Sequence, residues 1–330
     1  MNSMRACSRR AVLAVALCVL SGPFAVSAQA QSPTWPQRGV KFMLPFGAGS
    51  ATDVAARLIG ERLATKWGKP VVIENRPGAD GLLAIQAFTS ANDDHVLLYA
   101  SSASFIAHPY TQERLPYVLE RDLEPIARVA ETILTVSVPA DTNINTIANF
   151  VAAARAEPQK YNAAGAPGLP EFAVMAFLKN ENLGATKLPY RDIMQAGRDL
   201  GESRIQFLLS SYAAVRPLVE AGKVRVIAVG GKERTEVIPG VPTVIEAGYP
   251  GLNMETTSGF YGPRGMPLAL RQQIGAEVVA AASDPAISAK IVASGQIMRP
   301  QGPAELAAAL KDQAATAARI AKIIGLEMKN

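Results

Sequence analysis

The residues best suited to binding chemistry lie in the segment 46–53, a glycine-containing loop between two patterned runs. The apolar run 40–46 (VKFMLPF) predicts a buried strand, and apolar residues spaced three or four apart over 52–67 predict a helix. Gly47 and Gly49 lack Cβ atoms, so a ligand can approach the backbone closely. Free N–H groups and the dipole at a helix start favour an anion. The pattern predicts an anion-binding loop made of Phe46, Gly47, Ala48, Gly49, Ser50, Thr52 and Asp53.

Two other interpretations of this loop stay open from the residues alone. One is an ordinary glycine turn with Thr52 or Asp53 capping the helix. The other is a dinucleotide site, since the G-x-G-x-x-T pattern of 47–52 follows a strand and Glu74 ends the next one. The third glycine position holds threonine, however, and the export signal described below places the chain where nicotinamide cofactors are not expected. We therefore predict no cofactor.

A second loop with small residues, 161–171, leads into another predicted helix. Pro170 removes one amide hydrogen, and Glu171 at the helix start would compete with a ligand anion. A purely structural role for this loop therefore stays an alternative to anion binding. Its candidate contacts are Ala164, Gly165, Ala166 and Gly168.

Hydroxyl groups follow two predicted strands, 96–100 and 206–209. A hydroxyl can donate to a ligand and accept from it. Ligands of open α/β sheets bind at the carboxyl ends of the strands, so these serines are candidate ligand contacts. The alternative is that they are solvated residues of ordinary turns. The candidates are Ser101, Ser102, Ser104, Ser210 and Ser211.

Three further residues complete the predicted site. Tyr190 and Arg191 are candidates to meet a distal carboxylate, unless Arg191 is simply solvated. Asp192 can neutralise that arginine or accept from a ligand ammonium or hydroxyl. Ser258 lies where the chain is predicted to return to its first part, so it is also a candidate contact.

The composition offers little for catalysis. His95 and His108 are the only histidines, neither in a metal-ligand spacing, and we interpret His95 as part of a surface turn and His108 as structural. Cys7 and Cys18 are the only cysteines, and both lie within the first thirty residues. No G-x-S-x-G nucleophile motif occurs. The sequence therefore predicts no catalytic residue and no metal site.

The first thirty residues have the layout of a secretory signal peptide. Its features are a basic start, an apolar run and small residues for cleavage: Arg5, Arg9, Arg10, 11–20 (AVLAVALCVL) and 28–30 (AQA). About ten apolar residues are too few to cross about 30 Å of hydrocarbon as a helix. The adjacent Arg9 and Arg10 leave ordinary secretion and twin-arginine export both open. We predict cleavage, a periplasmic location and a net charge lowered from +5 to +2, too small to indicate a nucleic-acid partner.

The mature chain alternates predicted strands and helices, which indicates the α/β class. Three predicted loops, 46–53, 75–81 and 101–104, lie at the carboxyl edge of the first sheet. A second alternating unit follows, and a helical tail is predicted from about residue 267. We expect two lobes, 31–133 plus 255–330 and 134–254, each a doubly wound, mainly parallel sheet. A cleft between lobes is a favoured place for a small-molecule site.

Six segments match one known family in the family's order. They are 44–53 (LPFGAGSATD), 72–79 (VIENRPGA), 188–191 (LPYR), 221–225 (AGKVR), 238–248 (IPGVPTVIEAG) and 262–267 (GPRGMP). The chain resembles the substrate-binding proteins of tripartite tricarboxylate transporters, also called the Bug family, over essentially residues 35–328. The segment 161–171 departs from the family's hydroxyl-rich loop, and Asp192 stands where the family usually has glycine.

The resemblance implies a two-lobed venus-flytrap fold, a grip made largely by backbone amides, and capture of a small carboxylate for a transporter with two membrane subunits. It leaves open whether the acid is a dicarboxylate, an aromatic acid or an amino acid. A sensor for a membrane histidine kinase and a periplasmic enzyme are the alternatives. We expect a monomer that acts as a binding protein and not as an enzyme.

Overall fold

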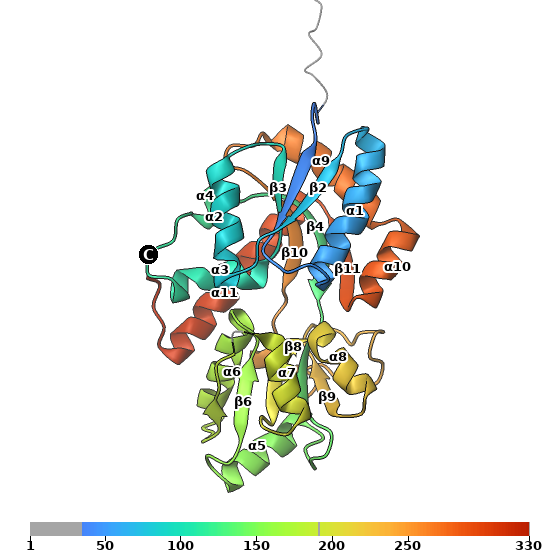
Figure 1. The fold of residues 1–330 in the computed structure, drawn as a ribbon. Coiled ribbons are helices and arrows are strands. Elements are labelled where there is room, and N and C mark those ends of the chain that lie inside the picture. The colour runs from blue at the N-terminus through green and yellow to red at the C-terminus, as the bar shows by residue number, and fades with distance from the viewer. Residues whose placement is uncertain (1–34, 191, 330) are drawn as a thin grey trace, which may run out of the picture. The chain divides into compact units, whose positions relative to one another are not determined.

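Two mixed β-sheets with helices packed around them organise the computed structural model, which describes residues 35–190 and 192–329 (Figure 1). Both sheets belong to one compact unit, Pro36–Asn330. The predicted signal peptide, 1–30, lies outside the described residues. The first sheet has the order β11-β4-β10-β3-β1-β2. Its strands are β1 (Val40–Leu44), β2 (Val71–Asn75), β3 (Val96–Ser101), β4 (Glu124–Thr132), β10 (Thr257–Gly262) and β11 (Gln296–Gln301).

The second sheet has five strands in the order β7-β6-β8-β5-β9. They are β5 (Leu134–Pro139), β6 (Asn162–Gly165), β7 (Thr186–Lys187), β8 (Phe207–Ser211) and β9 (Val224–Val229). Its helices are α5 (Ile147–Ala156), α6 (Leu169–Asn180), α7 (Ile193–Gly201) and α8 (Tyr212–Glu220), followed by the 3₁₀ turn η2 (Pro250–Leu252). We call this sheet and its helices the second lobe.

The first lobe consists of the six-stranded sheet and the helices that pack on it. In Figure 1, α1 and α10 lie on one side of this sheet and α2 and α3 on the other. The elements are α1 (Ala51–Trp67), α2 (Leu82–Ala91), α3 (Ser102–Thr111), α4 (Leu119–Asp122), α9 (Leu268–Ala282), α10 (Pro285–Ala293), α11 (Pro303–Ile324) and the 3₁₀ turn η1 (Ala79–Gly81).

The pairing corrects the expectation of mainly parallel sheets. In the first sheet β1 is parallel to β2 and β3, whereas β10 is antiparallel to β3 and β4, and β11 is antiparallel to β4. In the second sheet β6 is parallel to β7 and β8, and β5 is antiparallel to β8 and β9. The crossings between lobes account for β10 and β5, because each of these strands enters its sheet from the other lobe and therefore runs in the opposite direction.

The chain crosses between the lobes twice. Only Ile133 separates β4 from β5, and the chain returns between β9 and β10. The expected limits at 133 and 254 fall at these crossings, although the division into two domains stays a prediction. One buried apolar cluster runs from Phe88 in the first lobe to Phe150 and Phe207 in the second. Packing of α6 against α3 and α11 carries this cluster across the junction.

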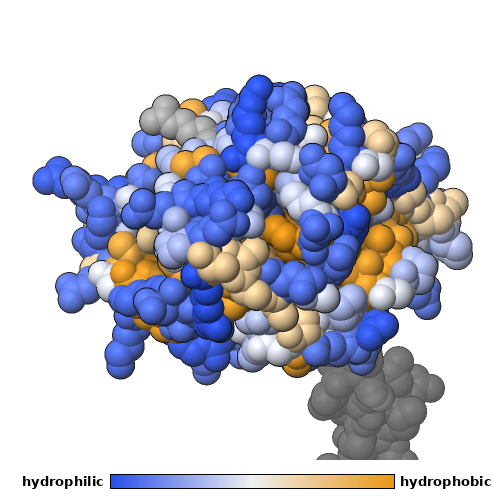
Figure 2. All heavy atoms as spheres, turned by 90° about the horizontal axis from the view of Figure 1, so that it is seen from below, coloured by the Kyte–Doolittle hydropathy of each residue, from blue (hydrophilic) through white to orange (hydrophobic). Residues whose placement is uncertain are grey.

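Several elements were not predicted from the sequence, among them α3, α7, β4 and β11. The strand β11 interrupts the expected helical tail because it pairs with β4. Within the part of the chain that is described, no helix is long and apolar enough to cross a membrane. Figure 2 views the end of the molecule that carries α5 and β9, where hydrophilic residues (blue) predominate and smaller hydrophobic areas (orange) lie between them.

Candidate functional site

A cavity of about 920 Å³ lies where the two lobes meet. Residues from the first lobe, the crossing segments and the second lobe all line it. They are Pro45, Phe46, Gly49, Ser50, Ala51, Thr52, Gly78, Ala79, Asp80, Gly81, Ser101, Ala103, Thr132, Leu134, Ala166, Pro167, Gly168, Pro170, Ile193, Met194, Ser211, Ala213, Ala214, Thr256, Gly295 and Gln296. A volume of this size suits a small organic molecule.

The N-terminus of α1 opens into this cavity. Ser50 is the N-cap: its Oγ accepts from the N–H of Asp53 at 3.2 Å, which leaves the hydroxyl hydrogen free to donate. No described residue accepts a hydrogen bond from the N–H of Ala51 or Thr52, the first two residues of the helix. The helix start therefore offers two peptide donors and one hydroxyl to a ligand, with the positive end of the helix dipole behind them.

Asp53 fixes the shape of the loop before α1 and is itself 2% exposed. Its Oδ2 accepts from the N–H of Gly49 and from Nε of Arg57, both at 2.9 Å, and its Oδ1 accepts from Nδ2 of Asn75 at 2.9 Å. Burial by itself raises the pKa of Asp53, but the hydrogen bonds from Arg57, Gly49 and Asn75 outweigh burial and hold that pKa below its usual value. Asp53 is therefore an internal strut of the loop. It does not line the cavity.

The glycines of this loop have open space beside them. A Cβ built on Gly47 or Gly49 would meet nothing within 4 Å. Gly49 has a φ of 83°, a left-handed conformation that glycine adopts at least cost. Gly49 lines the cavity, whereas Gly47 and Ala48, also predicted contacts, do not. The peptide N–H of Gly49 is not available to a ligand, because Asp53 takes it.

The second predicted loop enters the same cavity but offers fewer donors. Ala166 and Gly168 line the cavity, while Ala164 and Gly165 belong to β6 and do not line it. The N–H of Ala166 donates to the carbonyl of Leu209 at 2.8 Å. Glu171 forms an ion pair with Lys187, so its carboxylate is held by a partner in its own lobe. The expected competition of Glu171 with a ligand anion is therefore weakened by this pairing.

A third loop, Gly78–Gly81, lines the cavity and was not among the predicted site residues. His108 holds it in place. Its Nε2 lies 3.2 Å from the carbonyl oxygen of Asp80, which can only accept, so Nε2 carries the hydrogen and Nδ1 accepts from the hydroxyl of Tyr117 at 2.6 Å. Burial lowers the pKa of His108 and keeps the ring neutral. The structural interpretation of His108 agrees with these contacts.

The predicted serines divide between the cavity and the core. Ser101 and Ser211 line the cavity. Ser102 is fully buried, accepts from the N–H of Thr257 at 3.0 Å and donates to Gln313. Ser210 and Ser258 are also fully buried and do not line the cavity. Ser104 lies in α3, and its side chain is outside the described part of the structure.

Tyr190 and Asp192 form hydrogen bonds within the second lobe. The hydroxyl of Tyr190 donates to Oδ2 of Asp199 at 2.7 Å, and this residue does not line the cavity. Asp192 caps α7 by accepting from the N–H of Met194 at 2.9 Å. Arg191 lies outside the described residues. Ligand contact by Tyr190 and Arg191 stays a prediction.

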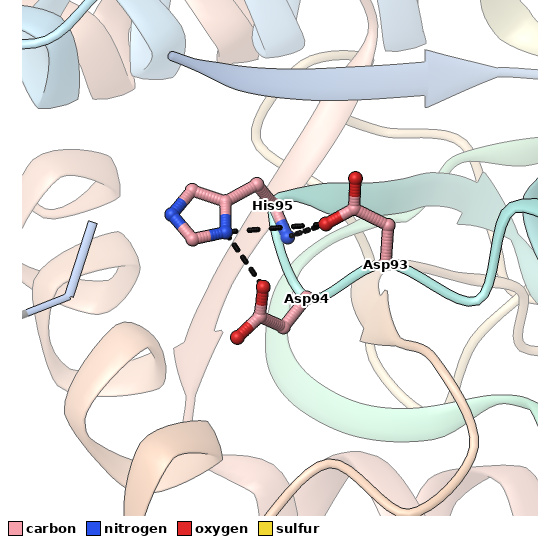
Figure 3. A group of neighbouring side chains, drawn as sticks. All are labelled: Asp93, Asp94 and His95. Carbon is pink, nitrogen blue, oxygen red and sulfur yellow. Dashed lines mark hydrogen bonds and ion pairs between the residues drawn. The ribbon is translucent and has the colours of Figure 1, made fainter. Parts of the chain in front are cut away.

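The one group of metal-ligand side chains among the described residues is Asp93, Asp94 and His95 (Figure 3). His95 lies in the expected turn, beside the exposed Asp94, but its own side chain is buried at 4% exposure. Its Nδ1 lies 2.6 Å from Oδ1 of Asp94, and its Nε2 accepts from the N–H of Gln37 at 3.2 Å. Both ring nitrogens are thus used in hydrogen bonds, and Asp93 is bound by Arg38 at 2.6 Å. These contacts tie the segment before β1 to the turn before β3.

Comparison with known proteins places this geometry in a family. Residues 55–326 match the model of the tripartite tricarboxylate transporter family receptor. A UPF0065 protein of Bordetella bronchiseptica is 31% identical over 307 residues, which cover 93% of this chain and 90% of that protein. Protein BugT of Bordetella pertussis is 28% identical over 231 residues, 68% of this chain and 70% of that protein.

Solved structures agree in fold. A protein of R. palustris solved with adipate superposes with a TM-score of 0.79 at 25% identity and covers 89% of this chain and 99% of that one. MatC of Rhodopseudomonas palustris, solved with bound malate, gives a TM-score of 0.74 at 25% identity and covers 88% of this chain and 99% of that one. The chain belongs to the tripartite tricarboxylate transporter receptor family, a family of periplasmic solute-binding proteins, and has their two-lobed α/β fold.

Proposed function

We propose that this protein captures a small organic acid in the periplasm and delivers it to the membrane subunits of a tripartite transporter. The proposal rests chiefly on one observation: the free N–H groups of Ala51 and Thr52 open into a cavity that both lobes line. The adipate and malate seen in relatives are acids of the kind that such donors suit. The predicted export signal at 1–30 provides the route to the periplasm, by either secretion pathway.

The described lining of the cavity offers the acid no cationic side chain. Among its described lining residues, Asp80 is the only one with a charged side chain. A carboxylate there is stabilised by peptide dipoles and hydroxyl groups, which are neutral and already oriented. Closure of the lobes removes water and strengthens each of these hydrogen bonds.

Replacing Ala51 with proline tests this grip. Proline is well tolerated at the first position of a helix, and it removes only the N–H proposed to bind the carboxylate. Ser50 has a ψ of 158°, which suits a residue before proline. We expect Ala51→Pro to fold normally and to lose at least tenfold in affinity, measured by calorimetry on residues 31–330 against small organic acids.

Leu268→Pro is the matched control, because Leu268 is the exposed first residue of α9 and does not line the cavity. It should bind like the parent protein. Equal affinity of Ala51→Pro and the parent would contradict the proposed grip. Failure of every small acid to bind or to raise the melting temperature would contradict the function itself, since a ligand at one hundred times Kd stabilises by about 2.7 kcal/mol.

A further inference from the structure

Three polar residues stand side by side at the cavity edge of the first sheet. Thr132 ends β4, Thr256 directly precedes β10, and Gln296 begins β11. Gln296 is the register partner of Thr132, whose N–H donates to the carbonyl of Thr256 at 3.1 Å. All three line the cavity. We call Thr132, Thr256 and Gln296 the sheet-edge cluster.

Two atoms of this cluster are buried without a hydrogen bond. Thr256 and Gln296 are each 1% exposed, and neither Oγ1 of Thr256 nor Oε1 of Gln296 has a partner among the described residues. An unsatisfied buried polar group costs about 1–3 kcal/mol, and native proteins keep few of them. Other buried side-chain atoms without partners, such as the hydroxyls of Tyr99 and Tyr261, belong to residues that do not line the cavity. The cluster thus places two residues that each carry an unmet hydrogen-bonding atom along one wall of the cavity.

The chemistry of the cluster selects its partner. A glutamine Oε1 only accepts, and a threonine hydroxyl both donates and accepts. The two residues flank Thr132 on either side, and together they can supply an acceptor for the hydrogen of a ligand hydroxyl and a donor for its oxygen. A ligand carboxylate would face the Gln296 oxygen as one acceptor against another.

The cluster is also electrically neutral, which disfavours an ammonium. A buried cation needs a paired anion, because unpaired burial is costly. Glu131 precedes Thr132, but its carboxylate is bound by Arg128 and Arg299. Asp80, the remaining carboxylate at the cavity, is exposed.

We propose that the sheet-edge cluster is a hydroxyl subsite and that the captured acid is a hydroxycarboxylate. Its carboxylate binds the N–H groups at the start of α1, and its hydroxyl binds Thr256 and Gln296. This inference rests on the proposed function, since it names the class of acid for the same cavity.

Three triads of acids test the proposal by calorimetry on residues 31–330. Within each triad one position carries hydrogen, hydroxyl or ammonium: succinate, malate and aspartate; propionate, lactate and alanine; phenylacetate, mandelate and phenylglycine. In any triad that binds, we expect the hydroxy acid to bind at least ten times more tightly than the other two members.

Thr256→Val and Gln296→Met remove the polar atoms and keep side chains of similar size. Each should weaken the hydroxy acid about tenfold and leave the unsubstituted acid unchanged. Since the Thr256 hydroxyl is unpartnered, we also expect Thr256→Val to keep or raise the stability of the ligand-free protein. Thr65→Val, on the exposed face of α1, is the control that should preserve the preference for hydroxyl.

The outcomes separate the two proposals. If acids bind but the hydroxy acid has no advantage, if the amino acid binds most tightly, or if the variants weaken all acids equally, the hydroxyl subsite is wrong and the proposed function stands. A Thr256→Val protein that is less stable without ligand would likewise assign this hydroxyl a structural role. If no member of any triad binds, the proposed function fails and the subsite fails with it.

Discussion

Two glycine-containing loops meet at the cavity, and the space beside their glycines differs. Beside Gly47 and Gly49, in the first lobe, a Cβ would enter open space. In the second lobe a Cβ on Gly165 would lie 2.5 Å from Cα of Glu171, and one on Gly168 would lie 2.8 Å from the carbonyl oxygen of Ala103. Gly49 thus leaves room for a ligand at the cavity, whereas the second pair lets α6 pack on its own strand and on the other lobe.

The helix starts differ in the same way. The start of α1 has a side-chain cap and two free N–H groups, while Gly168 caps α6 without a side-chain hydrogen bond and proline occupies position 170. The first loop is therefore better suited to the proposed anion binding. The second loop mainly closes the cavity, by contact between Gly168 and α3 and by the rings of Tyr110 and Phe172, whose centroids are 6.3 Å apart. Two loops with the same number of these glycines thus differ in role: the first leaves space at the cavity, and the second allows close packing of α6.

The largest predicted effect comes from Gly165→Ala. Its methyl group would overlap backbone atoms of Pro170 and Glu171, and main chain cannot move aside as a flexible side chain can. We expect a loss of about 2–3 kcal/mol in the free energy of unfolding, measured by urea denaturation. Gly47→Ala is the control and should change stability by less than about 0.5 kcal/mol. Equal losses of unfolding free energy in both variants would contradict the difference drawn between the glycines of the two loops.

Asp53→Asn should weaken the first loop. The substitution removes the charge that accepts from Gly49 and Arg57, and hydrogen bonds to charged groups contribute roughly 1.5–3 kcal/mol. We expect a loss of about 2 kcal/mol in stability together with weaker acid binding. Asp192→Asn is the matched control, since asparagine caps a helix as well as aspartate does. An Asp53→Asn protein as stable as the parent would contradict the proposal that the Asp53 carboxylate stabilises the loop before α1.

Gly168→Ala should act on lobe closure. Its φ of 91° disfavours alanine, and its methyl group would press on Ala103 of the other lobe. We expect an affinity loss of about tenfold and a larger radius of gyration by X-ray scattering in the presence of ligand. Gly49→Ala, at a φ of 83° with open space, carries the backbone strain alone and should leave that radius unchanged. An unaltered radius in Gly168→Ala would show that this contact does not govern closure.

The smallest effect concerns pH at the third loop. The pKa of His108 lies below its usual value of 6.5 in the folded protein, so the unfolded chain takes up the proton first as pH falls. Stability should therefore decrease below about pH 6.5, by on the order of 1 kcal/mol. Melting temperatures from pH 7.5 to 5 measure this, and His108→Gln, which keeps a donor for the Asp80 carbonyl, should flatten the profile. An identical slope in the variant would assign the pH dependence elsewhere.

Local patterns in the sequence predicted most helices correctly. Apolar spacing over 52–67 predicted α1, and the glycine loop before it does line the cavity in part. The strands β4 and β11 escaped prediction because their residues are extended by pairing with neighbours distant in the chain. The loop Gly78–Gly81 was placed at the correct sheet edge but was not counted as a site, since its position depends on His108.

By itself, the sequence determined the α/β class, the family and the glycine loop that leads into α1, because each is encoded within a few neighbouring residues. The tertiary structure decided which predicted donors are free: Asp53 takes the N–H of Gly49, and Ser102 turns to Gln313 and Thr257. It also brought Thr132, Thr256 and Gln296 together at one edge. Hydrogen-bond partners and strand register depend on segments far apart in the chain, so the spacing of neighbouring residues does not predict them.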